Sequence, residues 1–252
     1  MGAVIIGVDI GQKHDPTAIA VAEVESRQAG AYAEEYYLIR HLERLPIGTP
    51  YPAVVTRLGD VVNNTRKRGM VAAADAAARV AFDPSITAYR SAGVPLPRLA
   101  LYVDATGVGQ PVVDLLAHVG VPVTAVYFTH GDRRTVSEDH KTVSLGKAWL
   151  VSRLQALLQT GRILLPSTPE ARQLAKELLD YEIRVDEKAN DTYGAFKVGT
   201  HDDLVTALGL AVQETPRTAD SPVAGGTRGN VQSGFLSPPA FRGLPAPPRR
   251  RS

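Results

Sequence analysis

The chain contains 252 residues, of which 44% are hydrophobic and none is cysteine. A chain of this length and composition can bury a substantial core, as one large domain or as one domain with appendages. The lack of cysteine excludes disulfides and thiolate metal sites. A metal would therefore need oxygen or imidazole ligands, which favours hard cations such as Mg²⁺ and Mn²⁺.

The formal net charge of +2 is distributed unevenly along the chain. Residues 216–252 hold six arginines and one acid, a charge of +5, which leaves 22 basic and 25 acidic residues, or −3, over residues 1–215. Because this segment is rich in Pro, Gly and Ser and shows no apolar period, we predict a disordered tail over 216–252. Its end, "PPRRRS", suits contact with nucleic acid or an acidic partner, and equally suits a solubilising terminus.

Membrane insertion and secretion are not expected. No apolar run reaches the length of a membrane span, and the N-terminal "MGAVIIGVDIG" lacks the basic region and cleavage site of a signal peptide. The sequence therefore predicts a cytoplasmic protein that has no membrane partner.

The first elements form an antiparallel meander in our prediction. "AVIIGVDIG" (3–11) is a short apolar run that ends in Gly, and "TAIAVAEVE" (17–25) alternates apolar and polar residues, which is typical of neighbouring strands. "AYAEEYYLIRHLERL" (31–45) gives a third strand. Residues 51–69 follow with apolar residues at helical spacing, and 70–82 form either a second helix or a continuation of the first.

The next part of the chain predicts a βαβ unit. "RLALYVDATGVGQPVVDLLAHVG" (98–120) reads as a buried strand, a Gly-rich turn and a helix, and "VPVTAVYFTH" (121–130) supplies the next strand. The remaining predicted elements are a helix over 142–161, a short strand over 162–166, a helix over 168–185, a strand over 192–198 and a final helix within 199–213. The fold class is α/β, a mixed sheet with helices on both faces.

Aspartates lie at the ends of three of these elements. Asp9 ends the first strand, Asp104 ends the strand before "ATGVG", and Asp202 and Asp203 open the last helix. Each one alone has a structural explanation, since single aspartates are common at strand ends and cap the N–H groups of helix N-termini. Together they would repel one another and need a cation. Two hard divalent ions in such a cluster support phosphodiester hydrolysis.

Four blocks of the sequence, in this order, resemble the nuclease domain of tailed-phage terminase large subunits, which belongs to the RNase H-like superfamily. They are "GVDIGQKHDPTAIAVAE", "LYVDATGVGQPVVDLL", "KTVSLGKAWLVSRLQALLQTGRILLP" and "HDDLVTALGLA". The resemblance covers roughly residues 3–213. It implies an RNase H-like mixed sheet, an antiparallel meander plus parallel strands, in a nuclease domain that we assign to residues 1–215.

The resemblance also implies roles for individual residues. Asp9, Asp104 and Asp203 would be catalytic ligands of two Mg²⁺ or Mn²⁺ ions, and Asp202 an adjacent ligand or an outer group. Which of Asp202 and Asp203 binds metal more directly stays open. His201 either orients water or phosphate or is simply a neighbour of the helix N-terminus.

Two lysines are candidates for contact with DNA phosphates. Lys141 and Lys147 flank the start of the helix predicted over 142–161, which lies near the active site in this family. The alternative for each is a solvated surface lysine.

The function implied is a metal-dependent endonuclease that cuts duplex DNA during bacteriophage DNA packaging, in the cytoplasm of the host. Whole large subunits also carry an N-terminal packaging ATPase, whereas this chain begins at the nuclease strand and has no G-x-x-x-x-G-K-[ST] loop. We do not expect it to power translocation by itself. Its implied partners are double-stranded DNA and a separate packaging ATPase, small terminase subunit or portal.

Three other functions stay open. A RuvC-type Holliday-junction resolvase shares the fold and the carboxylate cluster. An actin-like or sugar-kinase-type nucleotide-binding protein is suggested by "GVDIG", although "DATGVG" is a poor second phosphate loop. The third is a DNA-binding scaffold with a relic site, which would bind DNA without cutting it.

Overall fold

The computed structural model describes residues 3–13, 15–29, 32–82, 98–185, 191–194 and 201–214. The predicted tail over 216–252 and the second half of the strand predicted over 192–198 lie outside the described residues. The boundary between a domain over 1–215 and a tail therefore stays a prediction.

Ten strands and five helices make up the described part of the chain. The strands are β1 (Val4–Asp9), β2 (Ala18–Ala29), β3 (Tyr32–Arg44), β4 (Leu99–Asp104), β5 (Thr124–Thr129), β6 (Arg134–Val136), β7 (Thr142–Gly146), β8 (Ile163–Leu164), β9 (Glu182–Val185) and β10 (Asp191–Gly194). The helices are α1 (Tyr51–Phe82), α2 (Gln110–His118), α3 (Lys147–Gln159), α4 (Pro169–Asp180) and α5 (Asp203–Ala211).

The main sheet has eight strands in the order β6-β7-β5-β4-β1-β2-β3-β8. The predicted meander is confirmed, because β2 pairs antiparallel with both β1 and β3. β4 pairs parallel with β1, and β5 and β7 continue this parallel half, which confirms the βαβ unit of β4, α2 and β5. The carboxyl ends of β1, β4, β5 and β7 therefore meet at one edge of the sheet.

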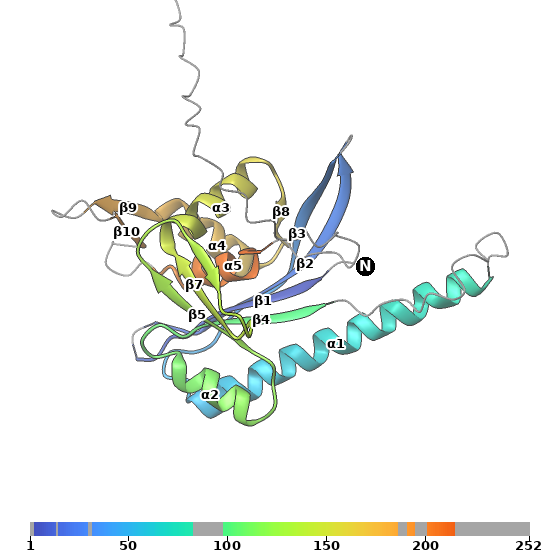
Figure 1. The fold of residues 1–252 in the computed structure, drawn as a ribbon, viewed down its shortest axis with the longest axis horizontal. Helices are drawn as coiled ribbons and strands as arrows, with labels where there is room; N and C mark the ends of the chain where they lie inside the picture. Colours follow the sequence, from blue (N-terminus) through green and yellow to red (C-terminus); the bar gives the residue numbers. More distant parts are fainter. Residues whose placement is uncertain are drawn as a thin grey trace, which may run out of the picture. The chain divides into compact units, whose positions relative to one another are not determined.

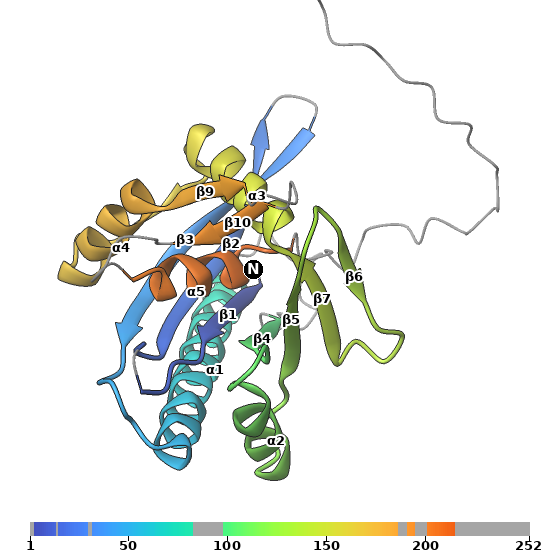
Figure 2. The same ribbon diagram turned by 90° about the vertical axis from the view of Figure 1, so that its left-hand side faces the viewer.

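Helices cover both faces of this sheet, as predicted, with α1 and α2 on one side and α5 on the other (Figures 1 and 2). Successive residues of β1 point to opposite faces, so Ile5 packs in the cluster that contains Leu208 of α5, and Ile6 in the cluster that contains Leu58 of α1. Each of these side chains is fully buried, and such burial contributes about 1.5–3 kcal/mol apiece.

α5 is the central helix of one face. Every residue of α5 except Thr206 is buried, as expected of a helix that is apolar on all sides. Gly7 of β1 permits its close approach, because a Cβ atom there would lie 2.2 Å from the carbonyl oxygen of Ala207. The glycine in "IIGVDIG" thus lets α5 rest directly on the backbone of β1.

Two predicted helices are corrected by the structure, and one open alternative is settled. Residues 142–146 form β7 rather than the start of a helix, since "TVSLG" carries β-branched residues and ends in Gly146, whose extended conformation begins α3 at Lys147. The helix predicted over 168–185 ends at Asp180, and the β-rich "EIRV" forms β9, which pairs with β10 in a separate sheet. Residues 70–82 continue α1 as one helix.

No helix in the described ranges is both long enough and apolar enough to cross a membrane.

Candidate active site

Asp9 and Asp104 lie at the same edge of the sheet. β1 and β4 pair in parallel with Val8 opposite Val103, so the next residue of each strand is an aspartate at the carboxyl end. The Asp104 carboxylate is oriented by the turn that follows it, because its Oδ1 accepts a hydrogen bond of 2.8 Å from the backbone N–H of Thr106. The arrangement expected from the strand order is therefore present.

α5 brings the other two aspartates to this edge. Asp203 lies in the first turn of α5 and is buried, with 3% of its surface exposed. Asp202 is the N-cap residue, yet its side chain makes no capping hydrogen bond. The close contact at Gly7 places the second half of α5 over β1, and the charges of Asp202 and Asp203 act on Asp9, so the helix start lies near the end of that strand. Helix capping thus does not account for the presence of a carboxylate at Asp202.

The four aspartates are close enough to act on one another electrostatically. Burial raises the pKa of the Asp9 carboxyl well above its usual value, and the negative charges of Asp104, Asp203 and Asp202 raise it further, while Lys147 acts in the opposite direction. Burial also raises the pKa of Asp104, against the hydrogen bonds from Thr106. This concentration of negative charge would be relieved by a bound cation.

Two buried polar atoms beside this cluster have no hydrogen-bond partner among the described residues. They are Oδ1 of Asp203 and Nδ1 of His201, which lie 3.8 Å apart, and the His201 nitrogen is also 3.7 Å from Oδ1 of Asp15. An unsatisfied buried carboxylate oxygen is costly unless a ligand completes it. The residues therefore fit a hard divalent cation, although no three His, Asp or Glu side chains of the described ranges already stand as a complete ligand set.

The structure adds two residues that the sequence analysis did not single out. Arg44, at the end of β3, donates from Nε to Oδ2 of Asp203 at 2.5 Å, and from its Nη2 to Oε1 of Glu177 on α4. Glu177 is 3% exposed, and burial raises its pKa although the Arg44 guanidinium opposes the shift. The acidic cluster therefore extends through Arg44 to a fifth carboxylate.

The two candidate lysines lie at different places. Lys147 is the first residue of α3, directly after β7, and its Nζ lies 5.5 Å from the ring centre of Phe128 at the end of β5. Lys141 comes just before β7. Since β7 has five residues, a strand length of about 16 Å separates the two. The expectation that both flank a helix start near the site is wrong for Lys141, which lies at the opposite edge of the sheet.

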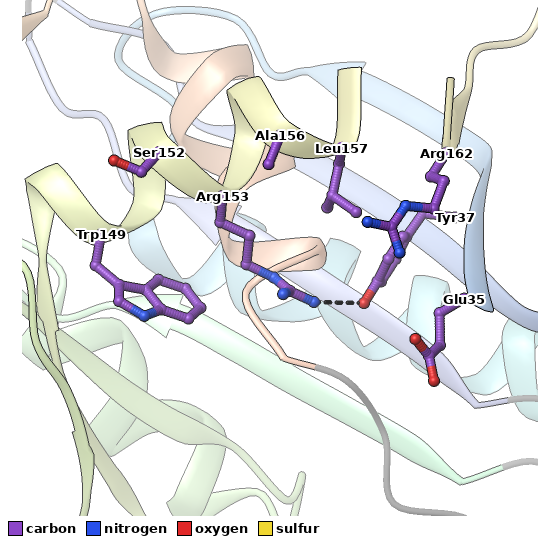
Figure 3. Close-up of a pocket in the computed structure, with 8 residues that line it drawn as sticks. All are labelled: Glu35, Tyr37, Trp149, Ser152, Arg153, Ala156, Leu157 and Arg162. Carbon is purple, nitrogen blue, oxygen red and sulfur yellow. Dashed lines mark hydrogen bonds between the residues drawn. The ribbon is translucent and has the colours of Figure 1, made fainter. Parts of the chain in front are cut away.

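A separate hollow, whose lining includes none of the four aspartates, lies between β3 and α3 (Figure 3). Its lining includes Tyr37, Trp149, Arg153 and Arg162. Arg153 points across it and donates to the Tyr37 hydroxyl at 2.6 Å, while its Nε donates to the carbonyl oxygen of Val212 at 2.5 Å. These hydrogen bonds hold α3 against β3 and the end of α5, so we assign a structural role to the residues that line the hollow.

Comparison with solved structures identifies proteins of the same fold. The chain is similar to the large terminase nuclease from thermophilic phage G20c, with 19% sequence identity, a TM-score of 0.53, and coverage of 85% of this chain and 83% of that chain. The magnesium-bound form of that protein gives 19% identity, a TM-score of 0.52, and coverage of 84% and 81%. The cobalt-bound form gives 20% identity, a TM-score of 0.50, and coverage of 84% and 81%.

Neither the known protein-family models nor the curated proteins include a match to this chain. The structural similarity establishes the fold, and it confirms both the RNase H-like mixed sheet and the resemblance in fold to terminase nuclease domains.

Proposed function

We propose that this chain, which has the fold of a large terminase nuclease domain, is a metal-dependent endonuclease that hydrolyses phosphodiester bonds of duplex DNA. The observation that carries the proposal is the convergence of Asp9, Asp104, Asp202 and Asp203 at one sheet edge, where Oδ1 of Asp203 is buried and finds no hydrogen-bond partner in the part of the chain that the structure describes. The magnesium- and cobalt-bound forms of the G20c nuclease support divalent cations at a fold of this kind.

Each residue of the cluster has a defined part in this proposal. Asp9, Asp104 and Asp203 would hold two Mg²⁺ or Mn²⁺ ions, with Asp202 as a further ligand or a hydrogen-bond acceptor for a coordinated water. Divalent ions held by these residues would supply activation of the attacking water and neutralisation of the charge on the departing 3′ oxygen, and the products would carry 5′-phosphate ends. His201, whose Nδ1 faces Asp203, would orient the attacked phosphate or the water.

Basic side chains at the same edge are suited to the DNA backbone. Lys13 follows β1, Arg133 follows β5 and Lys147 follows β7, and all three are exposed. Because the residues 1–215 carry a formal charge of −3, DNA binding would depend on such local positive groups. We propose that these three residues contact phosphates on either side of the cleaved bond.

Replacing Lys147 with alanine should weaken DNA binding and reduce the salt dependence of the binding constant by about one unit of logarithmic slope. Lys141→Ala is the matched control, since Lys141 lies at the opposite edge of the sheet and should leave the slope unchanged. Fluorescence anisotropy with a short labelled duplex at several salt concentrations measures both. Equal effects of the two substitutions would contradict the assignment of this edge as the DNA-binding edge.

The predicted tail should add to DNA affinity without being needed for folding. The last described residue, Glu214, is held to the core, as its carboxylate pairs with Arg134 at 3.4 Å and its carbonyl oxygen accepts from Tyr37 at 2.9 Å. Truncation after Pro216 should therefore keep the melting temperature and lower the logarithmic salt slope by up to about five for six arginines. Loss of folding in the truncated chain would contradict the predicted boundary.

The biological setting follows from the same proposal. A chain of this kind would cut genome ends during phage DNA packaging in the cytoplasm of the host, with a separate packaging ATPase, small terminase subunit or portal as partners.

Purified protein incubated with ATP should show no turnover, because a phosphate-binding loop is lacking in the sequence. Strong preference for four-way junctions over linear duplex would favour the resolvase alternative.

A further inference from the structure

Arg44 lies in register with the acidic cluster although it is two strands away from Asp9. Ala18 of β2 pairs with Asp9 on one side and with Arg44 on the other, which puts the two Cα atoms about 10 Å apart. From there the guanidinium reaches Asp203 and Glu177, and the Arg44 side chain is only 23% exposed. We propose that Arg44 is a positioning residue, which fixes Oδ2 of Asp203 so that Oδ1 is presented to the metal. This inference rests on the proposed metal-dependent function.

The contact between Arg44 and Asp203 differs from the ion pair that the preceding residue, Glu43, forms with Arg57. Glu43 points to the other face of β3, where Nε of Arg57 donates to both of its carboxylate oxygens at 3.0 Å and Nη2 donates to Oε2 at 2.9 Å. Both oxygens of Glu43 are thus satisfied. Asp203 accepts from Arg44 through Oδ2, whereas its buried Oδ1, like Oε2 of Glu177, has no hydrogen-bond partner within the described ranges. The Arg44 contact therefore orients a ligand rather than neutralising it completely.

Glu177 explains why the guanidinium stays in this orientation. Its buried carboxylate accepts from Nη2 of Arg44 while Nε of the same group faces Asp203. A planar guanidinium can address two carboxylates in fixed directions, whereas the ammonium of lysine is a point charge without such a fork. Burying such ions contributes little net stability compared with apolar residues of similar volume, so a role in the site accounts better for the group.

The test measures Mn²⁺ affinity of the full chain by isothermal titration calorimetry, without DNA. Arg44→Lys keeps the charge but removes the fork, and Arg44→Gln/Glu177→Gln removes one charge of each sign. Groups that orient metal ligands typically affect metal affinity 10- to 100-fold. We expect both variants to bind Mn²⁺ about 10-fold or more weakly than the wild type, and Arg57→Gln to bind like the wild type. Thermal melting in EDTA checks that each variant is folded.

Asp104→Asn separates this inference from the proposed function. If the wild type binds no Mn²⁺, or if Asp104→Asn binds it as tightly as the wild type, the metal site itself is wrong and the inference falls with it. If Asp104→Asn loses binding but both Arg44 variants retain wild-type affinity, only the positioning role is overturned. Tighter binding by the charge-balanced double variant would also overturn it. Should that variant fail to fold, Arg44→Lys decides.

Discussion

Replacing Asp104 with asparagine is expected to abolish DNA cleavage while the protein stays folded. Asparagine retains an oxygen that can accept the hydrogen bond from the Thr106 N–H, but it removes the negative charge that a divalent cation requires. Losing about 4 kcal/mol of transition-state stabilisation corresponds to about a thousandfold lower rate. Single-turnover nicking of a plasmid, with protein in excess over DNA, measures this difference directly.

The matched control is Asp114→Asn on α2, because Asp114 is an exposed aspartate outside the cluster and is bonded to Gln110. It should cleave like the wild type. Asp9→Asn and Asp203→Asn should be as inactive as Asp104→Asn, and Asp202→Asn milder or equal. Full activity in two of the variants at Asp9, Asp104 and Asp203 would refute the assignment of the cluster as the catalytic site.

Replacing Asp9 with asparagine should stabilise the metal-free protein at neutral pH. Burial and the neighbouring aspartates raise the pKa of Asp9 above its value in the unfolded chain. A carboxyl with a raised pKa favours folding when it is protonated, and this contribution is lost as the pH rises through the folded-state pKa. In EDTA at pH 7.5 the variant should therefore melt at a higher temperature than the wild type, and the difference should shrink on acidification.

In the presence of a divalent metal, the wild type should instead melt at a higher temperature than Asp9→Asn. A ligand that binds only the folded state at 100 times its Kd adds about 2.7 kcal/mol to the free energy of unfolding. Saturating Mn²⁺ should thus raise the melting temperature of the wild type and have little effect on Asp9→Asn, which lacks one of the proposed ligands. Calorimetric or fluorescence melting of both proteins in EDTA and in Mn²⁺ provides the measurement. An equal response of the two proteins to Mn²⁺ would contradict the proposed role of Asp9.

The sequence predicted the parts of the fold in which local pattern and topology agree. β1, β2 and β3 have strong apolar or alternating patterns, and the strand–turn–helix over 98–120 carries its own Gly-rich punctuation. The ends of parallel strands meet at one edge, so the expected meeting of Asp9 and Asp104 followed from strand order alone.

The errors arose where a short element adjoins a longer one. The sequence pattern assigns the five residues of β7 to the helix that begins at Lys147. Because of this error, Lys141 is predicted beside the site, whereas it lies at the opposite edge of the sheet. The four residues of β9 were likewise absorbed into α4. Short strands obtain their stability from pairing with distant strands, which local periodicity does not reveal.

Arg44 and Glu177 were missed for a different reason. Arg44 ends an alternating strand, and Glu177 lies in the amphipathic "ARQLAKELLD", where charged residues are usually solvated. Their burial depends on α4 and α5 packing on the same face of the sheet, which joins residues 133 positions apart in the chain. A sequence pattern does not encode that proximity.

The most direct test of the account is incubation of supercoiled plasmid with the purified chain in Mg²⁺, in Mn²⁺ or in EDTA. Manganese tolerates less regular coordination than magnesium and should support at least as much cleavage. We predict nicked and then linear DNA with either ion, 5′-phosphate ends, and intact plasmid in EDTA or with Asp104→Asn. Cleavage that persists in EDTA, or cleavage by Asp104→Asn at the wild-type rate, would contradict a metal-dependent nuclease built on this cluster.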